Sequence, residues 1–275
     1  FNQKEGAEDM EVVNRQKMFY VPRTGGISEE TDDILEEHQM DIYVNDTLVM
    51  KVSCTPSYLK ELVYGRLLTE GFVQSANDIE TVYICDEGYR AKVYLKSEVK
   101  DLIYRKSVLV PTCCTDNTGL EVVSERLIKE SALPPFQWQT SWIFNIADMF
   151  AKDTELHKRT MGTHSCILAR QSEVLISCED IGRHNAVDKV LGWGMCHHVN
   201  LSECILYTSG RIPMDMVRKS IRAHVPVLAS KAVPTVQAVN LAKSYGLVLI
   251  GAARPDRMKV FSGQPQNNTD IAEGA

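Results

Sequence analysis

The sequence lacks the features that mark membrane-spanning and secreted proteins. No apolar run approaches the roughly 20 residues that a bilayer-spanning helix needs. The N-terminal stretch FNQKEGAEDMEVVNRQK lacks the apolar core of a signal peptide. Eight cysteines in 275 residues are too dilute for a disulfide-stapled scaffold. We therefore expect a cytoplasmic protein with mostly free thiols and no contact with a membrane.

Positive charge and nucleotide-binding motifs are also scarce. The chain has 30 Lys and Arg against 36 Asp and Glu, a formal net charge of −6, so no global basic field favours a nucleic-acid partner. Neither GxGxxG nor GxxxxGKS/T occurs. The composition, 44% hydrophobic and 24% charged, is ordinary for a globular protein. The chain of 275 residues is long enough for one large domain or two smaller ones.

Three segments differ in their patterning. Residues 1–38 are polar and acidic and are expected to form a mobile arm. Residues 39–135 are typical of a smaller, β-rich α+β part, with hairpins predicted over 40–54 and 79–95. Between the hairpins, a helix is predicted with Thr55 as N-cap, Pro56 in the first helical position and Gly71 as the stop signal.

Residues 136–275 alternate short β-branched runs with helical patterns. An amphipathic helix is predicted over 140–153. The predicted strands are 173–178, 203–208, 225–229 and 247–251, with helices starting near Asn185, Pro213 and Pro234. This alternation favours a largely parallel sheet with helices on both faces, a three-layer α/β domain.

The densest polar motif is EDIGRHNAVDK (179–189), which follows a predicted strand. Its Asn185 is a plausible N-cap, with Asp188 in the third helical position. One interpretation is that the motif caps the helix and fixes the turn through an Asp–Arg pair, and the other is that it binds a polar ligand or partner. The stretch TSGRIP (208–213) repeats the strand–loop–helix arrangement, and Arg211 near a helix start could hold an anion. Two such loops at strand ends favour a binding site in this part of the sheet.

A metal site is weakly indicated at most. His164, Cys166, Cys178 and His184 could conceivably meet around a metal ion. A zinc deaminase needs a nearby His–Glu pair and P-C-x-x-C, and no PCxxC occurs in the sequence. We predict neither deamination nor a metal site.

Cys113 and Cys114 lie side by side in the polar stretch VLVPTCCTDNTGL. Neighbouring Cα atoms are about 3.8 Å apart, closer than an unstrained disulfide prefers. Adjacent side chains also diverge, which disfavours a shared metal. A thiol in a loop can instead attack a partner's reactive atom as the thiolate. From these residues alone, inert thiols and reactive thiols both remain possible.

Together, EDIGRHNAVDKVLG, TSGRIPMDMVRKS, VPVLASKAVPTVQAVNLAKSYGLVLIGAAR and RTMGTHSCIL resemble the FdhD family of formate dehydrogenase accessory sulfurtransferases. The resemblance covers residues 40 to 262 and includes GRLLTEGFVQSANDI (65–79). It implies a cytidine-deaminase-like α/β domain that lacks the zinc site. It also implies a homodimer.

The same resemblance implies a function as sulfur carrier. A loop cysteine would take sulfur from a cysteine desulfurase as a persulfide and pass it to molybdenum bis(molybdopterin guanine dinucleotide), which then enters formate dehydrogenase. That cofactor would be cargo, and the carrier would need no catalytic metal of its own. Whether such a carrier counts as an enzyme, a sulfurtransferase, is left open.

This chain departs from the family at the cysteine loop. The usual Cys-x-x-Cys is replaced by Cys113-Cys114-Thr115-Asp116, so Cys113 aligns with the first cysteine and Asp116 with the second. Cys114 is nearly as defensible in the first position. We predict a single persulfide-carrying thiol, Cys113, and an alternative is a cofactor chaperone whose degenerate loop no longer moves sulfur.

The segment GAARPDRMKVFS (251–262) resembles the family segment associated with the cofactor. The resemblance assigns cofactor contacts to Ala252, Ala253, Arg254, Pro255, Asp256 and Arg257. The two arginines suit diphosphate oxygens because a guanidinium presents paired donors. The alternative is a last strand with solvated arginines.

Overall fold

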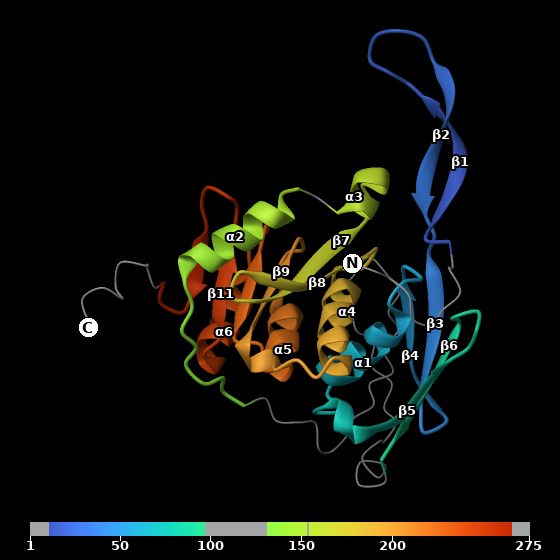
Figure 1. Ribbon diagram of the computed structural model, residues 1–275. Helices are drawn as coiled ribbons and strands as arrows, with labels where there is room; N and C mark the ends of the chain where they lie inside the picture. Colours follow the sequence, from blue (N-terminus) through green and yellow to red (C-terminus); the bar gives the residue numbers. More distant parts are fainter. Residues whose placement is uncertain (1–10, 97–130, 153, 266–275) are drawn as a thin grey trace.

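A computed structural model describes residues 11–96, 131–152 and 154–265, whose strands form three sheets (Figure 1). The first is an antiparallel two-stranded ribbon, the β1–β2 ribbon, of β1 (Val13–Tyr20) and β2 (Ser28–Leu35). The second has the order β4-β3-β6-β5, with β3 (His38–Val44), β4 (Thr47–Cys54), β5 (Ile79–Ile84) and β6 (Arg90–Leu95).

The third sheet is the largest and has the order β12-β11-β10-β9-β7-β8. Its strands are β7 (His164–Arg170), β8 (Glu173–Asp180), β9 (Cys204–Thr208), β10 (Val227–Ser230), β11 (Val248–Gly251) and β12 (Lys259–Ser262). Strands β9, β10 and β11 are parallel, while β7, β8 and β12 run antiparallel to their neighbours. The four predicted strands are confirmed, whereas β7 was not recognised because its start was interpreted as a candidate metal motif.

Both hairpins predicted in the N-terminal half are confirmed. β3 and β4 pair across Asn45 and Asp46, whose φ angles of 47° and 62° are the left-handed values of a two-residue turn. β5 and β6 pair around Gly88, with φ 71°. Parallel pairing between β3 and β6 joins the hairpins into one sheet.

Helix α1 (Leu59–Glu70) begins later than predicted, so the assignment of Thr55 as N-cap and of Pro56 to the first turn is wrong. Tyr58 occupies the N-cap position, and Gly71, with φ 81°, ends the helix as expected. The reason is a tertiary contact. The Thr55 hydroxyl donates to Asp180 Oδ2 at 3.1 Å and accepts from Lys189 Nζ at 2.8 Å, so this side chain serves the core instead of accepting from the helix N–H groups.

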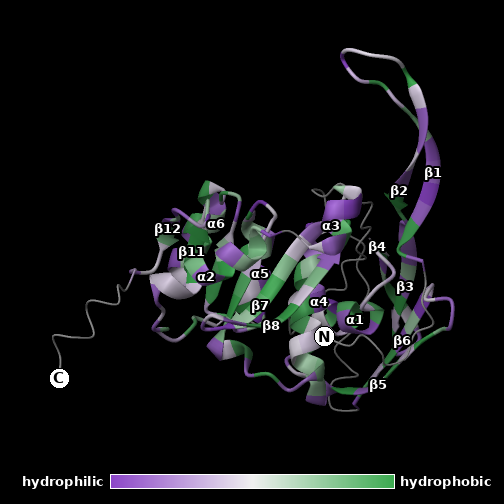
Figure 2. Cartoon of the chain, turned by 45° about the horizontal axis from the view of Figure 1, so that its top comes forward, coloured by the Kyte–Doolittle hydropathy of each residue, from purple (hydrophilic) through white to green (hydrophobic). Residues whose placement is uncertain are grey.

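Helices cover both faces of the large sheet, so the chain has a mixed α/β fold (Figure 1). Helix α2 (Thr140–Phe150) lies on one face, and α4 (Arg183–Cys196), α5 (Met214–Arg222) and α6 (Val236–Tyr245) lie on the other. Alternate strand residues divide between two cores. Ile205 and Tyr207 pack in the α2 cluster, and Leu206 packs in the opposite one. Figure 2 shows the central strands as hydrophobic and the β1–β2 ribbon as mainly hydrophilic.

Three shorter elements complete the described part: α3 (Glu155–Thr160) and the 3₁₀ turns Ala76–Asp78 and Leu201–Glu203. No helix among the described residues is both long and apolar enough to cross a membrane.

The two larger sheets share one core because α1 packs directly on α4. The helices touch at two glycines. A Cβ on Gly65 would lie 1.8 Å from Asp188 O, and one on Gly192 would lie 1.8 Å from Glu61 O. Only glycine permits this backbone-to-backbone approach.

We expect Gly192→Ala to lower the free energy of unfolding by at least about 2 kcal/mol, because a methyl group there must push α1 away from α4. Thermal unfolding followed by circular dichroism measures the change. Gly26→Ala is the matched control, since a Cβ there meets nothing within 4 Å. Equal melting temperatures for the two variants would contradict the packing described above.

Candidate functional site

The ends of several strands converge at one edge of the large sheet, the carboxyl-end edge. It comprises the start of β7 (164–165), the end of β8 with the first turn of α4 (179–184), and the segments after β9, β10 and β11 (209–215, 230–235 and 251–257). The register places His164 opposite Asp180, and Thr208 beside both Cys166 and Ser230. Both strand-end loops predicted as a binding region therefore lie at the same edge.

The two loops are in direct contact. A Cβ on Gly210 would lie 2.9 Å from Arg183 Cδ and 3.0 Å from Arg183 Cβ, so the arginine stem lies against the glycine. Ser230 Oγ donates to Gly210 O at 2.6 Å and ties the third loop to the second. The strand-end loops of the two motifs thus lie together at one edge of the sheet.

Asp180 is an internal anchor rather than a ligand-binding group. Its carboxylate is fully buried, 2.7 Å from Lys189 Nζ, and also accepts from Gly182 N at 2.8 Å and Asn185 Nδ2 at 2.9 Å. Asn185 is therefore not the N-cap that the sequence predicted. Gly182 takes that position, and Asn185 Nδ2 also donates to Ser53 O at 2.7 Å.

Asp188 and Lys219 form a second buried pair. Lys219 Nζ lies 2.8 Å from both carboxylate oxygens, and Thr69 Oγ1 and Arg66 Nη1 donate to the same carboxylate at 2.8 and 3.3 Å. Burial lowers the pKa of Lys219, and the carboxylate of Asp188 opposes that shift. Glu70 lies beside these cations, and their charges bring its pKa below the ordinary value although burial acts in the other direction.

Glu179 holds α3 in place. Its carboxylate accepts from the backbone of His157 at 2.9 Å and of Leu156 at 3.3 Å, and from Thr163 Oγ1 at 2.8 Å. Four acidic and basic residues of the EDIGRHNAVDK motif thus serve internal contacts: Glu179, Asp180, Asp188 and Lys189. These residues therefore serve the fold, although through the Asp180–Lys189 and Asp188–Lys219 pairs and not through the expected Asn185 cap and Asp–Arg pair.

Two histidines lie at the carboxyl-end edge and bond to side chains of the 209–215 segment. His164 Nδ1 is 3.1 Å from Ser209 Oγ, and His184 Nε2 is 2.9 Å from Asp215 Oδ2. Burial is the main cause that lowers the pKa of His164 and of His184, and the nearby charge of Arg183 acts in the same direction on both. Both rings are therefore held neutral near pH 7 and can accept a proton.

The pairing of His184 with Asp215 was not predicted, because the two residues lie in the first turns of separate helices that are 31 positions apart in the sequence. One sequence signal points to the pairing. Each residue lies at the start of a helix that follows a strand, and the strand order brings these two helix starts to the same edge of the sheet.

The segment 251–257 forms a tight turn at the same edge. The backbone N–H groups of Ala252 and Ala253 donate to Ala232 O at 2.7 Å and Ser230 O at 2.9 Å, and Arg254 N donates to Arg257 O at 2.7 Å. Tyr207 Oη donates to Ala253 O at 2.8 Å. The backbone of this turn is thus occupied by internal contacts.

The side chains of the turn remain available to a ligand. Arg254, Pro255, Asp256 and Arg257 are all exposed, and Arg257 Nη1 lies 2.9 Å from Asp256 Oδ2. These four side chains are thus accessible to a ligand at this edge.

Cys113 and Cys114 lie outside the described residues. Among the described cysteines, burial raises the pKa of Cys54 and Cys178 to about 12 and that of Cys196 and Cys204 to about 11. Burial also raises the pKa of Cys166 well above its ordinary value. These five thiols stay protonated and are poor nucleophiles.

No group of three or more His, Cys, Asp or Glu side chains in the described part of the chain is arranged to hold a metal ion. The conceivable set of His164, Cys166, Cys178 and His184 does not form one. Instead, Cys166 and Cys178 are paired across β7 and β8 inside the core.

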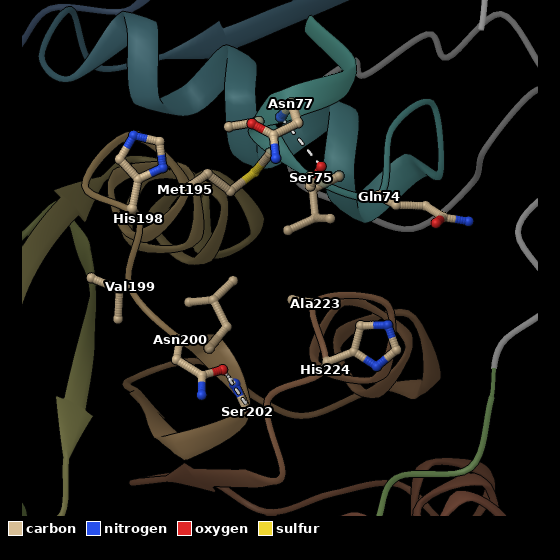
Figure 3. A pocket seen from close by; sticks show the side chains of 13 residues that line it. Gln74, Ser75, Asn77, Met195, His198, Val199, Asn200, Ser202, Ala223 and His224 are labelled. Atoms are coloured by element: carbon tan, nitrogen blue, oxygen red, sulfur yellow. Dashed lines mark hydrogen bonds between the residues drawn. The ribbon is translucent and has the colours of Figure 1, made fainter. Parts of the chain in front are cut away.

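A groove of about 460 Å³ lies at the opposite edge of the sheet, where α4 and α5 end (Figure 3). Met195, Val199 and Ala223 line its interior, and His198 and His224 stand on its walls. Its lining contains no carboxylate, lysine, arginine or thiol. The carboxyl-end edge is therefore the candidate functional site.

The chain matches the model of the FdhD/NarQ family over residues 35–267. It is 30% identical to the sulfur carrier protein FdhD of Listeria monocytogenes serotype 4b (strain F2365) over 258 residues, which span 92% of this chain and 98% of the relative. The sulfur carrier protein FdhD of Wolinella succinogenes is 27% identical over 240 residues, 86% of this chain and 82% of the relative.

A crystal structure of a protein from Desulfotalea psychrophila, assigned as a formate dehydrogenase accessory protein, is similar to this one with a TM-score of 0.73. It is 25% identical and covers 92% of this chain and 97% of its own. The described fold is thus shared over nearly the full length of both chains.

We expect His184→Gln to reduce the loss of stability on acidification. A histidine with a folded pKa below 6.5 binds a proton more readily when unfolded, so its contribution to stability falls as pH drops through 6.5. The pKa of Asp215 lies below its ordinary 3.8, outside this window.

The measurement is the difference in melting temperature between about pH 7.5 and about pH 5.5. The exposed His224→Gln is the control. The difference should shrink in His184→Gln without vanishing, because the pKa of His164 is lowered too. An unchanged difference would show that His184 is not buried as described.

Proposed function

Because the chain belongs to the FdhD/NarQ family, we propose that it is an accessory sulfur carrier for formate dehydrogenase. The observation that carries this proposal is the match to the family over residues 35–267, with sulfur carriers among the relatives. In this role the chain takes sulfur from a cysteine desulfurase and delivers it to the molybdenum cofactor before the cofactor is inserted. The cytoplasm, where that cofactor is assembled, is the expected location.

The sulfur is carried as a persulfide on Cys113, or on Cys114 if the alignment is shifted by one. The thiolate attacks the outer sulfur of the donor persulfide, a new S–S bond forms, and the donor cysteine leaves as a thiolate. Delivery as sulfide takes two electrons from a thiol reductant. The raised pKa values of five described cysteines support this assignment, because they leave few other thiols able to compete.

The cargo, molybdenum bis(molybdopterin guanine dinucleotide), is expected at the carboxyl-end edge. The exposed guanidinium groups of Arg254 and Arg257 suit its diphosphate oxygens, with Pro255 and Asp256 beside them. The turn that holds them is fixed by the backbone contacts of Ala252 and Ala253. Arg183 and Arg211 add positive charge at the same edge.

The proposal includes a cytidine-deaminase-like ancestry for the large-sheet domain, with the zinc site lost. It also includes a homodimer and direct association with formate dehydrogenase. The competing function is a cofactor chaperone that binds the same cargo without moving sulfur. The altered cysteine loop, Cys113-Cys114-Thr115-Asp116, is the feature that favours this competitor.

Incubation with an active cysteine desulfurase and cysteine should add about 32 Da, the mass of one sulfur atom, to the peptide that contains Cys113 and Cys114. Peptide mass spectrometry locates the adduct. We expect Cys113→Ala to abolish the adduct and Cys114→Ala to retain it, while the half-buried Cys85→Ala serves as control.

The reverse ranking would assign the persulfide to Cys114. Absence of any adduct on this peptide, while the same donor loads a known acceptor, would exclude the carrier role and leave the chaperone.

A further inference from the structure

The turn over residues 251–257, the 251–257 turn, holds its backbone in a strained conformation. Ala252 has a φ angle of 49°, a left-handed value that residues other than glycine seldom adopt. Such strain persists only where the surrounding structure over-determines the backbone, and it is concentrated at functional sites. The contacts that hold the turn therefore bear on its function.

The segment after β10 fixes one side of the turn. The backbone N–H of Ala252 donates to Ala232 O at 2.7 Å. A Cβ on Gly251 would lie 2.8 Å from Pro234 Cδ and 3.1 Å from Ala232 O, so the two segments are in close contact. The carbonyl group of Ala253 takes its partner from a different element, strand β9.

Tyr207, near the end of β9, supplies that partner. Its hydroxyl donates to Ala253 O at 2.8 Å, and the two residues are 1% and 0% exposed. Because the bond is buried, a ligand at the carboxyl-end edge does not touch it. Burial raises the pKa of Tyr207 to about 12, although the nearby charge of Arg254 acts in the other direction. The hydroxyl therefore keeps its proton and donates throughout the neutral range.

Aromatic packing fixes the direction of this hydroxyl. The ring of Phe150, the last residue of α2, is tilted against the ring of Tyr207, with the centroids 4.8 Å apart. On Phe150 in turn lies Lys231 Nζ, 5.4 Å from the ring centroid. Close packing of this kind leaves a buried ring few alternative rotamers. The hydroxyl of Tyr207 is thus presented to the turn by a fixed part of the core.

The bond from Tyr207 acts on the part of the turn that carries the arginines. Arg254 directly follows Ala253, and Arg254 N donates to Arg257 O at 2.7 Å, which links the two arginines through the backbone. Asp256 Oδ2 lies 2.9 Å from Arg257 Nη1, whereas Arg254 forms no ion pair with another described residue. A shift of Ala253 O would therefore move Arg254 directly and Arg257 through it.

We propose that Tyr207 is a positioning residue for the 251–257 turn. Its hydroxyl holds Ala253 O, and with it Arg254 and Arg257, in the arrangement that binds diphosphate oxygens before the ligand arrives. A turn that is already ordered loses less conformational entropy on binding, so affinity rises without any contact between Tyr207 and the ligand. This inference rests on the proposed function, because it takes the diphosphate of the cargo as the ligand of the turn.

The test is the binding of GDP to the purified full chain, measured by isothermal titration calorimetry. GDP reproduces the guanosine diphosphate end of the proposed cargo. Tyr207→Phe removes only the hydroxyl and keeps the ring against Phe150. We expect the dissociation constant for GDP to rise about 5-fold to 10-fold, as the loss of one hydrogen bond implies.

Ser220→Ala is the matched control. The Ser220 hydroxyl is also buried and donates to Val225 O at 3.1 Å, at the opposite edge of the sheet. Both variants lose a buried hydroxyl-to-carbonyl bond, so the melting temperature should fall in both. The affinity for GDP should fall only in Tyr207→Phe, which separates positioning from a general loss of stability.

Backbone amide exchange, followed by peptide mass spectrometry, gives a second readout. Without ligand, the peptide that contains residues 251–257 should exchange faster in Tyr207→Phe than in the wild type or in Ser220→Ala. Saturating GDP should reduce this difference, because the ligand then orders the turn.

The outcomes separate this inference from the proposed function. If the wild type binds GDP and Tyr207→Phe binds it equally well, the positioning role is wrong while the cargo site stands. Equal weakening in Ser220→Ala, or unchanged exchange of the turn in Tyr207→Phe, would also overturn it. A wild type that does not bind GDP would overturn both the inference and the cargo site. Persulfide loading of Cys113 or Cys114 needs no GDP, so the carrier role is tested separately.

Discussion

Two lysine ammonium groups buried against aspartates determine where α4 lies relative to the rest of the molecule. Lys189 pairs with Asp180, and Lys219 pairs with Asp188, and all four side chains are buried. Removing one partner from such a pair typically costs about 3–5 kcal/mol, since the other charge is left buried and uncompensated. The pairs therefore hold only if β4, α1, α4 and α5 all keep their positions.

This constraint separates structural charges from functional ones. Glu179, Asp180, Asp188 and Lys189 are used inside the protein, although they belong to its most conspicuous motif. The groups at the carboxyl-end edge are different in kind: neutral histidines, the exposed Arg211, Arg254 and Arg257, exposed apolar side chains, and the partly exposed carboxylates of Asp215 and Asp256. The exposed arginines suit an anionic ligand.

Local patterns predicted the elements well where a single stretch of chain decides the outcome. Asn45-Asp46 formed the expected turn, because both residues tolerate left-handed backbone angles. The predicted caps at Thr55 and Asn185 failed, because those side chains bond to residues more than 100 positions away in the sequence. For the same reason His184 and Asp215 could not be paired from spacing alone. The two strand-end loops could be chosen as binding-site candidates from the sequence, since ligands tend to bind beyond the carboxyl ends of strands in such sheets.

The proposed function is that this chain, whose buried charges are paired internally, carries sulfur to a cofactor on Cys113 or Cys114. The most direct measurement is formate dehydrogenase activity in cells that lack their own accessory protein of this family and express this chain instead. The account predicts that the wild-type chain restores activity, and that Cys113→Ala/Cys114→Ala accumulates equally but restores none. Full restoration by the double variant would contradict it.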